Sequence, residues 1–109
     1  MENEARNNRL LHALGICAKA RRLVIGAAMI CEALRGKNKP FLVVAASDNA
    51  ANTQKKLSDK CAFYNVPLVE TELDGETIGA AVGKHTKVAA VAITDEQLCR
   101  LVENTMKKN

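Results

Sequence analysis

A glycine that follows a short apolar run is the feature of this sequence best suited to binding an anion. The run 23–25 leads into Gly26, and the first turn of the helical pattern after it carries no charge. The first N–H groups of a helix have no partner within the helix and carry partial positive charge. Those of Gly26, Ala27 and Ala28 can therefore approach an anion closely. Basic residues on both sides of this helix are Arg21, Arg22, Lys37 and Lys39.

Two interpretations of this turn stay open on these residues. Spread cations and close main-chain contact suit the phosphate backbone of a nucleic acid. A strand-to-helix turn whose alanines pack against a sheet explains the same pattern. On these residues alone the packing interpretation is the stronger.

A second candidate surface is a polar loop late in the chain. Its residues are Gly83, Lys84, His85, Thr86 and Lys87. The glycine permits an unusual backbone angle, the lysines supply charge, and the histidine and threonine can form hydrogen bonds. This loop leads into a predicted strand, whereas the Gly26 turn follows one. The two can meet at one end of a sheet if the strands run in suitable directions, although an ordinary exposed loop fits the loop sequence equally well.

Candidates for catalysis and metal binding are weaker. His12 and His85 are the two histidines of the chain, and no flanking motif supports a Cys/His nucleophilic pair. The acidic residues within 70–76 suit a solvated sheet edge better than a metal site. Gly26 lacks the companion residues of a nucleotide-phosphate loop. The sequence therefore favours a protein without catalysis, cofactor or metal.

The positive charge of the chain is concentrated in its first third. Residues 1–40 carry eight Lys/Arg against three Asp/Glu, whereas residues 41–86 carry four against six. A polyanion-binding surface needs such a basic segment, although moderately basic surfaces also occur in proteins that bind no polyanion. Aromatic residues make up 3% of the chain, which argues against single-strand binding by base stacking. An RNA partner is therefore expected to be a folded element.

The cellular setting follows from apolar runs and cysteines. No apolar run approaches the roughly 18–20 residues needed to cross a bilayer, and the polar start MENEARNNRL contains no apolar signal region. The cysteines are Cys17, Cys31, Cys61 and Cys99, far apart and never in a C-x-x-C pair. This spacing indicates reduced, buried thiols rather than disulfides or zinc ligands. We expect a cytoplasmic monomer that does not contact a membrane.

Helix-like and strand-like apolar periods alternate along the chain. Helices are expected over residues 4–20, 26–35, from the capping residues 47–49 to 64, about 75–82 and from 95 onward. Strands are expected over 23–25, 41–46, 68–70 and 88–93. Such alternation predicts the α/β class, as a three-layer alpha-beta-alpha sandwich around a small four-stranded mixed sheet. The short first and third strands suggest weak edges. The length suits one domain over residues 1–109.

Four helix ends carry capping patterns. The residues Ser47-Asp48-Asn49 offer capping oxygens for the third helix, and Asp74 offers one for the fourth. Gly36 is well placed to end the second helix. The segment Thr94-Asp95-Glu96-Gln97 has the form of a capping box for the last helix.

Several short segments between about Leu10 and Leu101 also carry a family likeness, weak singly and strong together. They are Ala18-Lys19-Ala20-Arg21-Arg22 leading to Gly26; Asp48; Asn52-Thr53 with Lys55-Lys56-Leu57; Asp59-Lys60-Cys61; Tyr64-Asn65-Val66-Pro67; Ile78-Gly79; and Gly83-Lys84. On these residues the sequence resembles the bacterial YlxQ-type ribosomal-protein-like family. That family lies within the kink-turn RNA-binding superfamily of large-subunit ribosomal protein seven-Ae.

The resemblance implies an alpha-beta-alpha sandwich, no catalysis, and binding to a sharply bent RNA internal loop. In the family, the segment after the first strand has the pattern Gly-x-Asn-Glu, with a lysine three residues past the Glu. The corresponding residues here are Gly26, Ala28, Met29 and Glu32, so the glycine is kept and the side chains that contact sheared G·A pairs are replaced. The family loop that packs on the RNA corresponds to Lys84, His85, Thr86 and Lys87.

Two functional hypotheses result. The first is a non-enzymatic RNA-binding protein of the ribosome or its assembly, with ribosomal proteins as further partners. Its RNA-binding residues would be Arg21, Arg22, Gly26, Ala27, Ala28, Met29, Glu32, Lys37, Lys84, His85, Thr86 and Lys87. The second is a protein–protein interaction module of the same fold, in which residues 27–29 form an apolar patch, because methionine suits adaptable contacts.

Overall fold

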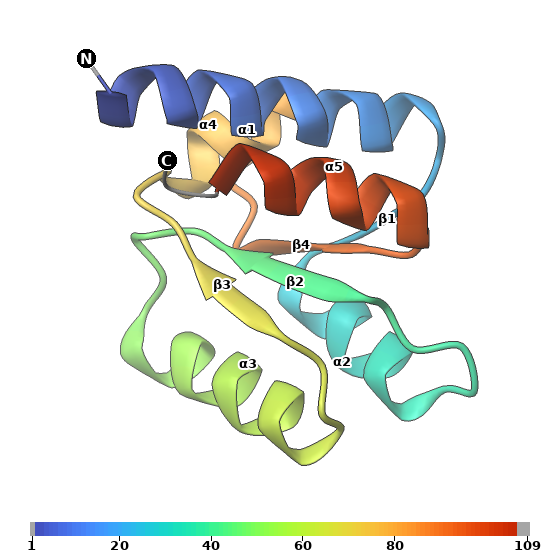
Figure 1. The fold of residues 1–109 in the computed structure, drawn as a ribbon. Helices are drawn as coiled ribbons and strands as arrows, with labels where there is room; N and C mark the ends of the chain where they lie inside the picture. The colour runs from blue at the N-terminus through green and yellow to red at the C-terminus, as the bar shows by residue number, and fades with distance from the viewer. Residues whose placement is uncertain (1, 107–109) are drawn as a thin grey trace.

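A four-stranded sheet forms the middle layer of the computed structural model, which describes residues 2–106 (Figure 1). The strands lie in the order β1 (Leu23–Ile25), β4 (Ala90–Ile93), β2 (Leu42–Ala45) and β3 (Leu68–Glu70). β4 is antiparallel to both β1 and β2, and β3 is parallel to β2. The predicted mixed sheet is confirmed, with the short first and third strands at its edges.

Helices cover both faces of this sheet. The helices α1 (Glu2–Lys19), α4 (Gly75–Ala81) and α5 (Glu96–Met106) lie on one face, and α2 (Ala27–Arg35) and α3 (Ala51–Phe63) lie on the other (Figure 1). This arrangement confirms the predicted three-layer sandwich. Within residues 2–106, no helix is both long enough and apolar enough to span a membrane.

The core consists of two apolar layers separated by the sheet. Every residue of the central strands β2 and β4 is buried. Because successive side chains of a strand point to opposite faces, Val44 and Val91 pack with α1, α4 and α5. Val43 and Ala92 pack with α2 and α3. Burial on both faces explains why these strands appear in the sequence as continuous apolar runs.

Two of the predicted helix starts are correct in place and wrong in the capping residue. No side chain caps α3, which begins after Ala50, and Asp48 forms its contacts elsewhere. At α5, Asp95 rather than Thr94 acts as the cap, since its Oδ1 accepts the Leu98 N–H at 2.9 Å. These local patterns offered several oxygens, and the fold uses one or none of them.

The other two predicted helix ends agree with the structure in position. Asp74 caps α4, and its Oδ1 accepts the Thr77 N–H at 2.8 Å. Gly36 ends α2, although its backbone is extended (φ −80°) and not left-handed. That position therefore has no conformational need for glycine.

Two non-glycine residues adopt the left-handed conformation directly after a helix. Arg21 follows α1 and Asn65 follows α3, each with φ of 59°. In both places the next residue donates its N–H back into the last turn, from Arg22 to the Cys17 carbonyl at 3.0 Å and from Val66 to the Cys61 carbonyl at 2.9 Å. These two turns direct the chain into β1 and toward β3.

The four cysteines are buried and free, which confirms the prediction of buried thiols. Burial, with a smaller effect from the nearby Cys31, raises the pKa of the Cys61 thiol to about 11. Burial is also the main cause of the raised pKa values of Cys17 and Cys99. At Cys17, Cys61 and Cys99 the raised pKa favours the neutral thiol over the thiolate.

Candidate nucleic-acid interface

The start of α2 and the polar loop meet at one end of the sheet. We call this the loop end, formed by residues 26–29, 46–49, 71–75 and 83–89. The antiparallel register pairs Ile25 with Val91, so the chain leaving β1 lies beside the chain entering β4. The Gly26 N–H donates to the Ala90 carbonyl at 2.9 Å. The antiparallel direction of β1 and β4 therefore brings the two segments together, a meeting that the sequence left conditional on strand direction.

The start of α2 is open. Gly26 has φ of 97°, a conformation that residues with a Cβ rarely adopt, and a Cβ built there would meet nothing within 4 Å. No side chain caps this helix, so the N–H groups of Ala27, Ala28 and Met29 have no side-chain partner in the described part of the chain. The Met29 side chain is 59% exposed. Main-chain donors and an apolar side chain therefore face solvent together.

The polar loop is held in place by α4. The Lys84 N–H donates to the Gly79 carbonyl at 2.8 Å. A Cβ at Gly79 would lie 2.3 Å from the Thr86 carbonyl oxygen, so the loop can rest on the helix backbone only because this residue is glycine. All five loop residues are exposed in this arrangement: Gly83, Lys84, His85, Thr86 and Lys87.

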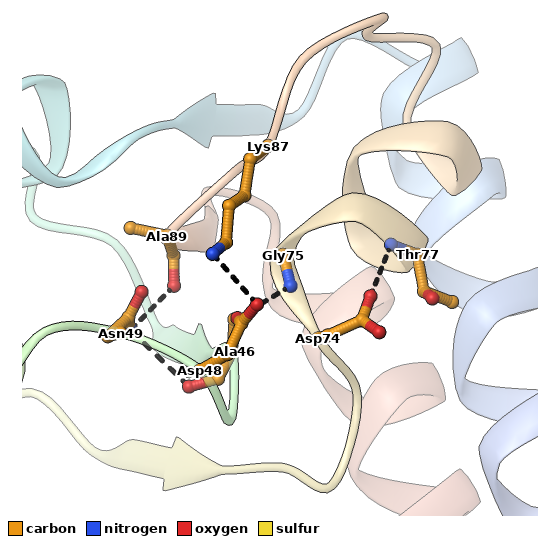
Figure 2. Close-up of polar contacts among 8 residues, drawn as sticks. All are labelled: Ala46, Asp48, Asn49, Asp74, Gly75, Thr77, Lys87 and Ala89. Atoms are coloured by element: carbon orange, nitrogen blue, oxygen red, sulfur yellow. Dashed lines mark hydrogen bonds and ion pairs between the residues drawn. The ribbon is translucent and has the colours of Figure 1, made fainter.

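Asp48 connects the polar loop to α4 (Figure 2). Its Oδ2 lies 3.0 Å from the Lys87 Nζ, and its Oδ1 accepts the Gly75 N–H at 2.9 Å. The Lys87 ammonium first, and then the Gly75 N–H, lower the pKa of the Asp48 carboxyl from its ordinary value. The ion pair also partly neutralises Lys87, which leaves Lys84 as the more available cation of the loop.

Asn49 joins the chain after β2 to the chain before β4. Its Nδ2 donates to the Ala89 carbonyl at 3.0 Å and to the Ala46 carbonyl at 3.3 Å (Figure 2). The prediction that Ser47, Asp48 or Asn49 caps α3 is wrong, since no side chain caps this helix. Their position in the sequence, directly after a buried strand, is the feature that could have indicated their place at the loop end.

Three of the predicted RNA-contacting cations lie elsewhere. Arg21 and Arg22 precede β1, whose first residue Leu23 pairs with Ile93 at the far end of β4. Lys37 follows the last turn of α2. All three therefore lie at the end of the sheet opposite the loop end (Figure 1). The prediction that they surround the start of α2 is wrong, because β1 and α2 each carry the chain across the sheet.

Glu32 lies on α2 one turn beyond the open helix start. Its Oε1 accepts from the Arg35 Nη2 at 2.8 Å, and both side chains are exposed. Exposed pairs of this kind contribute at most about 1 kcal/mol to stability. The acid and its partner are therefore free to be exchanged without harm to the fold.

Comparisons with known proteins agree with this architecture. The family described as ribosomal protein L7Ae/L30e/S12e/Gadd45 matches residues 8–102. The RNA-binding protein YlxQ of Bacillus subtilis (strain 168) is 35% identical over 83 residues, covering 76% of this chain and 80% of that protein. The RNA-binding protein YlxQ of Enterococcus faecium is 30% identical over 89 residues, covering 82% and 84%.

Solved structures show the same fold. A protein of unknown function from Bacillus halodurans superposes with a TM-score of 0.82 at 29% identity, covering 92% of this chain and 98% of that one. The 15.5kD RNA-binding protein of Giardia lamblia superposes with a TM-score of 0.74 at 20% identity, covering 92% and 83%. From the family match over most of its length and the two relatives at 30% identity or more, the chain belongs to the ribosomal protein L7Ae/L30e/S12e/Gadd45 family.

Proposed function

We propose that this chain is a non-enzymatic RNA-binding protein whose loop end contacts a sharply bent, kink-turn-like RNA element. The observation that carries the proposal is the open start of α2, with unpartnered N–H groups, beside the exposed loop 84–87. Two relatives at 30% identity or more are named as RNA-binding proteins, which supports RNA as the partner. The family also supports the absence of catalysis.

The loop end has the properties that recognition of a folded RNA requires. The N–H groups of Ala27, Ala28 and Met29 can donate to phosphate oxygens or base edges. The loop is fixed on α4 and by the Asp48 contacts, so little conformational freedom would be lost on binding. A rigid surface of this kind recognises RNA by its shape. Lys84 adds a cation without a described partner.

The replaced side chains at α2 define the expected strength of binding. Ala28 and Met29 stand where the family resemblance implies amide and carboxylate side chains, and Glu32 stands where it implies a lysine. Each good side-chain contact to a base edge contributes about 1–3 kcal/mol of discrimination. We therefore propose that this chain contacts the bend through its main chain and Met29, with modest affinity.

Fluorescence anisotropy with a labelled kink-turn RNA and a straight duplex of equal length tests the proposal. We expect the bent RNA to bind more tightly, with an affinity that falls as salt rises. Lys84→Ala should make the slope of log K against log salt shallower by about 0.9, the value for one phosphate contact on a duplex. Arg9→Ala, on the exposed surface of α1, is the matched control. Equal binding of both RNAs, or a flat salt dependence, would contradict the proposal.

A gain-of-function variant makes the same test from the other direction. Ala28→Asn, Met29→Glu and Glu32→Lys together restore the side chains that the resemblance implies. We expect at least about tenfold tighter binding of the kink-turn RNA and no gain on the straight duplex. Glu32→Lys alone is the control, because the added positive charge should strengthen the binding of both RNAs to the same extent.

Association with the ribosome or its assembly is part of the proposal. Co-sedimentation of the full chain with ribosomal particles in a sucrose gradient tests it. Release by moderate salt and by Lys84→Ala is expected, because phosphate contacts would hold the chain there. A chain that stays at the top of the gradient would contradict ribosome association and leave RNA binding to be decided by anisotropy.

A protein–protein interaction module is a second candidate, favoured by the 59% exposure of Met29 beside Ala28. An exposed methionine next to small residues makes an adaptable apolar contact. Affinity capture from lysate treated with nuclease separates the two functions. Partners that remain after nuclease and are lost with Met29→Asp would favour this candidate.

A further inference from the structure

All three aromatic residues of the chain lie at the end of the sheet opposite the loop end. Phe41 directly precedes β2, and its N–H donates to the carbonyl of Ile93, the last residue of β4, at 2.8 Å. Phe63 ends α3, and Tyr64 follows it before β3. In Figure 1, the loop between α2 and β2 and the turn between α3 and β3 both lie at this end. We call it the aromatic end, defined by Phe41, Phe63, Tyr64, Lys37, Lys39 and Lys60.

Two of these rings are open to solvent. The Phe63 side chain is 78% exposed and that of Phe41 is 44% exposed. Phe63 and Tyr64 meet edge to face, with ring centroids 4.9 Å apart and an interplanar angle of 88°. In a pair of this geometry one ring presents its edge, so a flat face remains available. The exposed faces are suited to stacking against another flat group.

Lys39 brings positive charge to the rings and joins the two segments. Its Nζ donates to the Gly36 carbonyl at 2.9 Å and lies 5.2 Å from the centre of the Tyr64 ring. A lysine ammonium at this distance from an aromatic face is attracted to it. The contact holds the loop before β2 against the end of α3, so the charge and the rings keep a fixed relation.

The two segments that carry the rings contain no acidic residue, and the acids that follow β4 at this end have partners of their own, Asp95 in the Leu98 N–H and Glu96 in Arg100. Residues 36–41 and 60–67 contain Lys37, Lys39 and Lys60 and no Asp or Glu. The nearest acids along α2 and α3 are Glu32 and Asp59, which already pair with Arg35 and Lys55. The three lysines have no carboxylate partner among the described residues. Arg21 and Arg22 add charge at the β1 side of the same end.

We propose that the aromatic end binds single-stranded RNA, with unpaired bases stacked on Phe63 and Phe41 and phosphates neutralised by the three lysines. Exposed rings beside cations are the combination that single-strand binding needs, and stacking tolerates any base. A double-stranded element keeps its bases stacked inside and cannot offer them. The inference rests on the proposed function only in taking RNA as the polymer, since the two surfaces share no residue.

The low aromatic content argued against such stacking, and the fold changes the weight of that argument. Three rings spread over a surface could not form a platform. Here all three rings lie at one end of the sheet, where two are exposed and the third contacts a lysine. Together they can offer stacking surfaces to unpaired bases. The relevant quantity is therefore the local density of rings and cations.

Anisotropy of a labelled oligouridine of about ten nucleotides, which has no stable secondary structure, tests the inference on the full chain. We expect Phe63→Ala to weaken binding about 5- to 100-fold, the equivalent of one lost stacked base. Phe63→Leu keeps apolar bulk and lacks the ring, so it should lose as much, whereas Phe63→Trp should keep the affinity. Lys37→Ala should reduce the salt slope by about 0.7, the value for one phosphate of a single strand.

The matched control is Leu101→Ala, which shortens another partly exposed side chain (37%) on α5 and should change nothing. Thermal melting followed by circular dichroism confirms that each variant is folded, as expected for exposed positions. No binding of oligouridine by the unaltered chain would overturn the inference. Full binding by Phe63→Leu would also overturn it, since the surface would then be an apolar contact of the kind that proteins make.

Failure here and failure of the proposed function give different results. The loop-end variant Lys84→Ala should alter binding of the kink-turn RNA and leave oligouridine unaffected. Phe63→Ala should do the reverse. If the unaltered chain binds oligouridine but does not prefer the kink-turn RNA, the proposed function alone is overturned. If it prefers the kink-turn RNA but does not bind oligouridine, this inference alone is overturned.

Discussion

Arg21 occupies a backbone conformation that stability alone would give to glycine. It is the second residue beyond α1, with φ of 59°, and its N–H donates to the Ala18 carbonyl at 3.0 Å. The left-handed region is unfavourable by about 1–2 kcal/mol for a residue with a Cβ. The exposed guanidinium of Arg21 lies at the aromatic end, where a cation would assist RNA binding. A residue kept in such a conformation is a candidate for a functional role.

Replacing this arginine should therefore stabilise the fold. We expect Arg21→Gly to raise the free energy of unfolding by about 1 kcal/mol in urea denaturation, because it removes the left-handed strain and touches no core contact. Asn65→Gly is the matched control at the equivalent position after α3. Asparagine tolerates this conformation, so its gain should be smaller. Equal gains would show that Arg21 is no more strained than Asn65, and no gain from Arg21→Gly would show that it is not strained.

Asp48 should make part of the stability depend on pH. Its folded pKa lies below the usual value of about 3.9, because it pairs with Lys87 and accepts the Gly75 N–H. The pair therefore stabilises the protein fully above about pH 5, and the contribution is lost as pH falls through the lower folded pKa. Asp48→Asn keeps an acceptor and lacks the charge.

Urea denaturation of both proteins between neutral and acidic pH measures this effect. We expect the unaltered chain to be the more stable at pH 7, and the difference to shrink below pH about 4 as Asp48 becomes protonated. Because both partners are partly exposed, added salt should reduce the difference at neutral pH. A difference that stays constant down to the lowest pH would show that the carboxylate charge makes no contribution.

At the scale of elements, α4 acts as the support of the polar loop. The Gly79 backbone lies against Thr86, and a Cβ would approach its carbonyl oxygen to 2.3 Å. We expect Gly79→Ala to lower the free energy of unfolding by about 1–3 kcal/mol, since loop and helix must move apart. Kink-turn binding should weaken as well, because the loop would leave the open start of α2.

Gly36→Ala is the control for this substitution. Its backbone is extended, and a Cβ there would lie 3.4 Å from the Ala33 carbonyl, an ordinary contact. The free energies of unfolding and of RNA binding should both stay within about 0.5 kcal/mol of those of the unaltered chain. If Gly79→Ala were equally silent, the loop would not depend on the close approach to α4.

The ends of a helix or strand could be predicted from the sequence where neighbouring residues determine them. The edge strands β1 and β3 begin and end as predicted, because turn-forming residues bound short apolar runs. The central strands are shorter than their apolar runs, since Phe41 and Val88 lie outside the ladder. The capping roles of Asp48 and Thr94 were predicted wrongly. Asp48 finds its partners 27 and 39 residues along the chain, and no local pattern reveals such pairs.

The candidate site shows the same division between local and distant information. The meeting of Gly26 with the polar loop could be foreseen only as a possibility, because one follows a strand and the other precedes one. The grouping of Arg21, Arg22 and Lys37 with Gly26 could not, since neighbours in sequence are separated by the length of β1 or α2. The same separation hid the collection of aromatic residues. Strand direction, which sequence periodicity does not give, decides all three.

At the scale of the whole molecule, the buried thiols offer a probe of global opening. All four cysteines are buried, Cys17 and Cys99 in one core layer and Cys61 in the other, and burial raises the pKa of Cys61 to about 11. At pH 8 we expect no rapid reaction with an aromatic disulfide reagent, because the thiols are buried and access to them requires opening of the fold. All four thiols should react together, at a rate that rises with urea in parallel with unfolding.

Each cysteine that reacts releases one aromatic thiolate from the reagent. The absorbance of this thiolate gives the number of reacting cysteines and their rate. The fully unfolded chain is the reference for four reactive thiols. One thiol that reacts rapidly in the folded protein would identify a region that opens locally.

Helix α2 begins at the loop end and finishes at the aromatic end, so its length sets a minimum reach for any ligand that uses both. Nine residues of α-helix extend about 13 Å. An RNA whose unpaired tail is too short to span the length of this helix could not touch Phe63 while its bend rests on Gly26. If the tail is lengthened one nucleotide at a time, the affinity should therefore rise sharply at one length. That length is set by the distance that α2 spans between the two ends of the sheet.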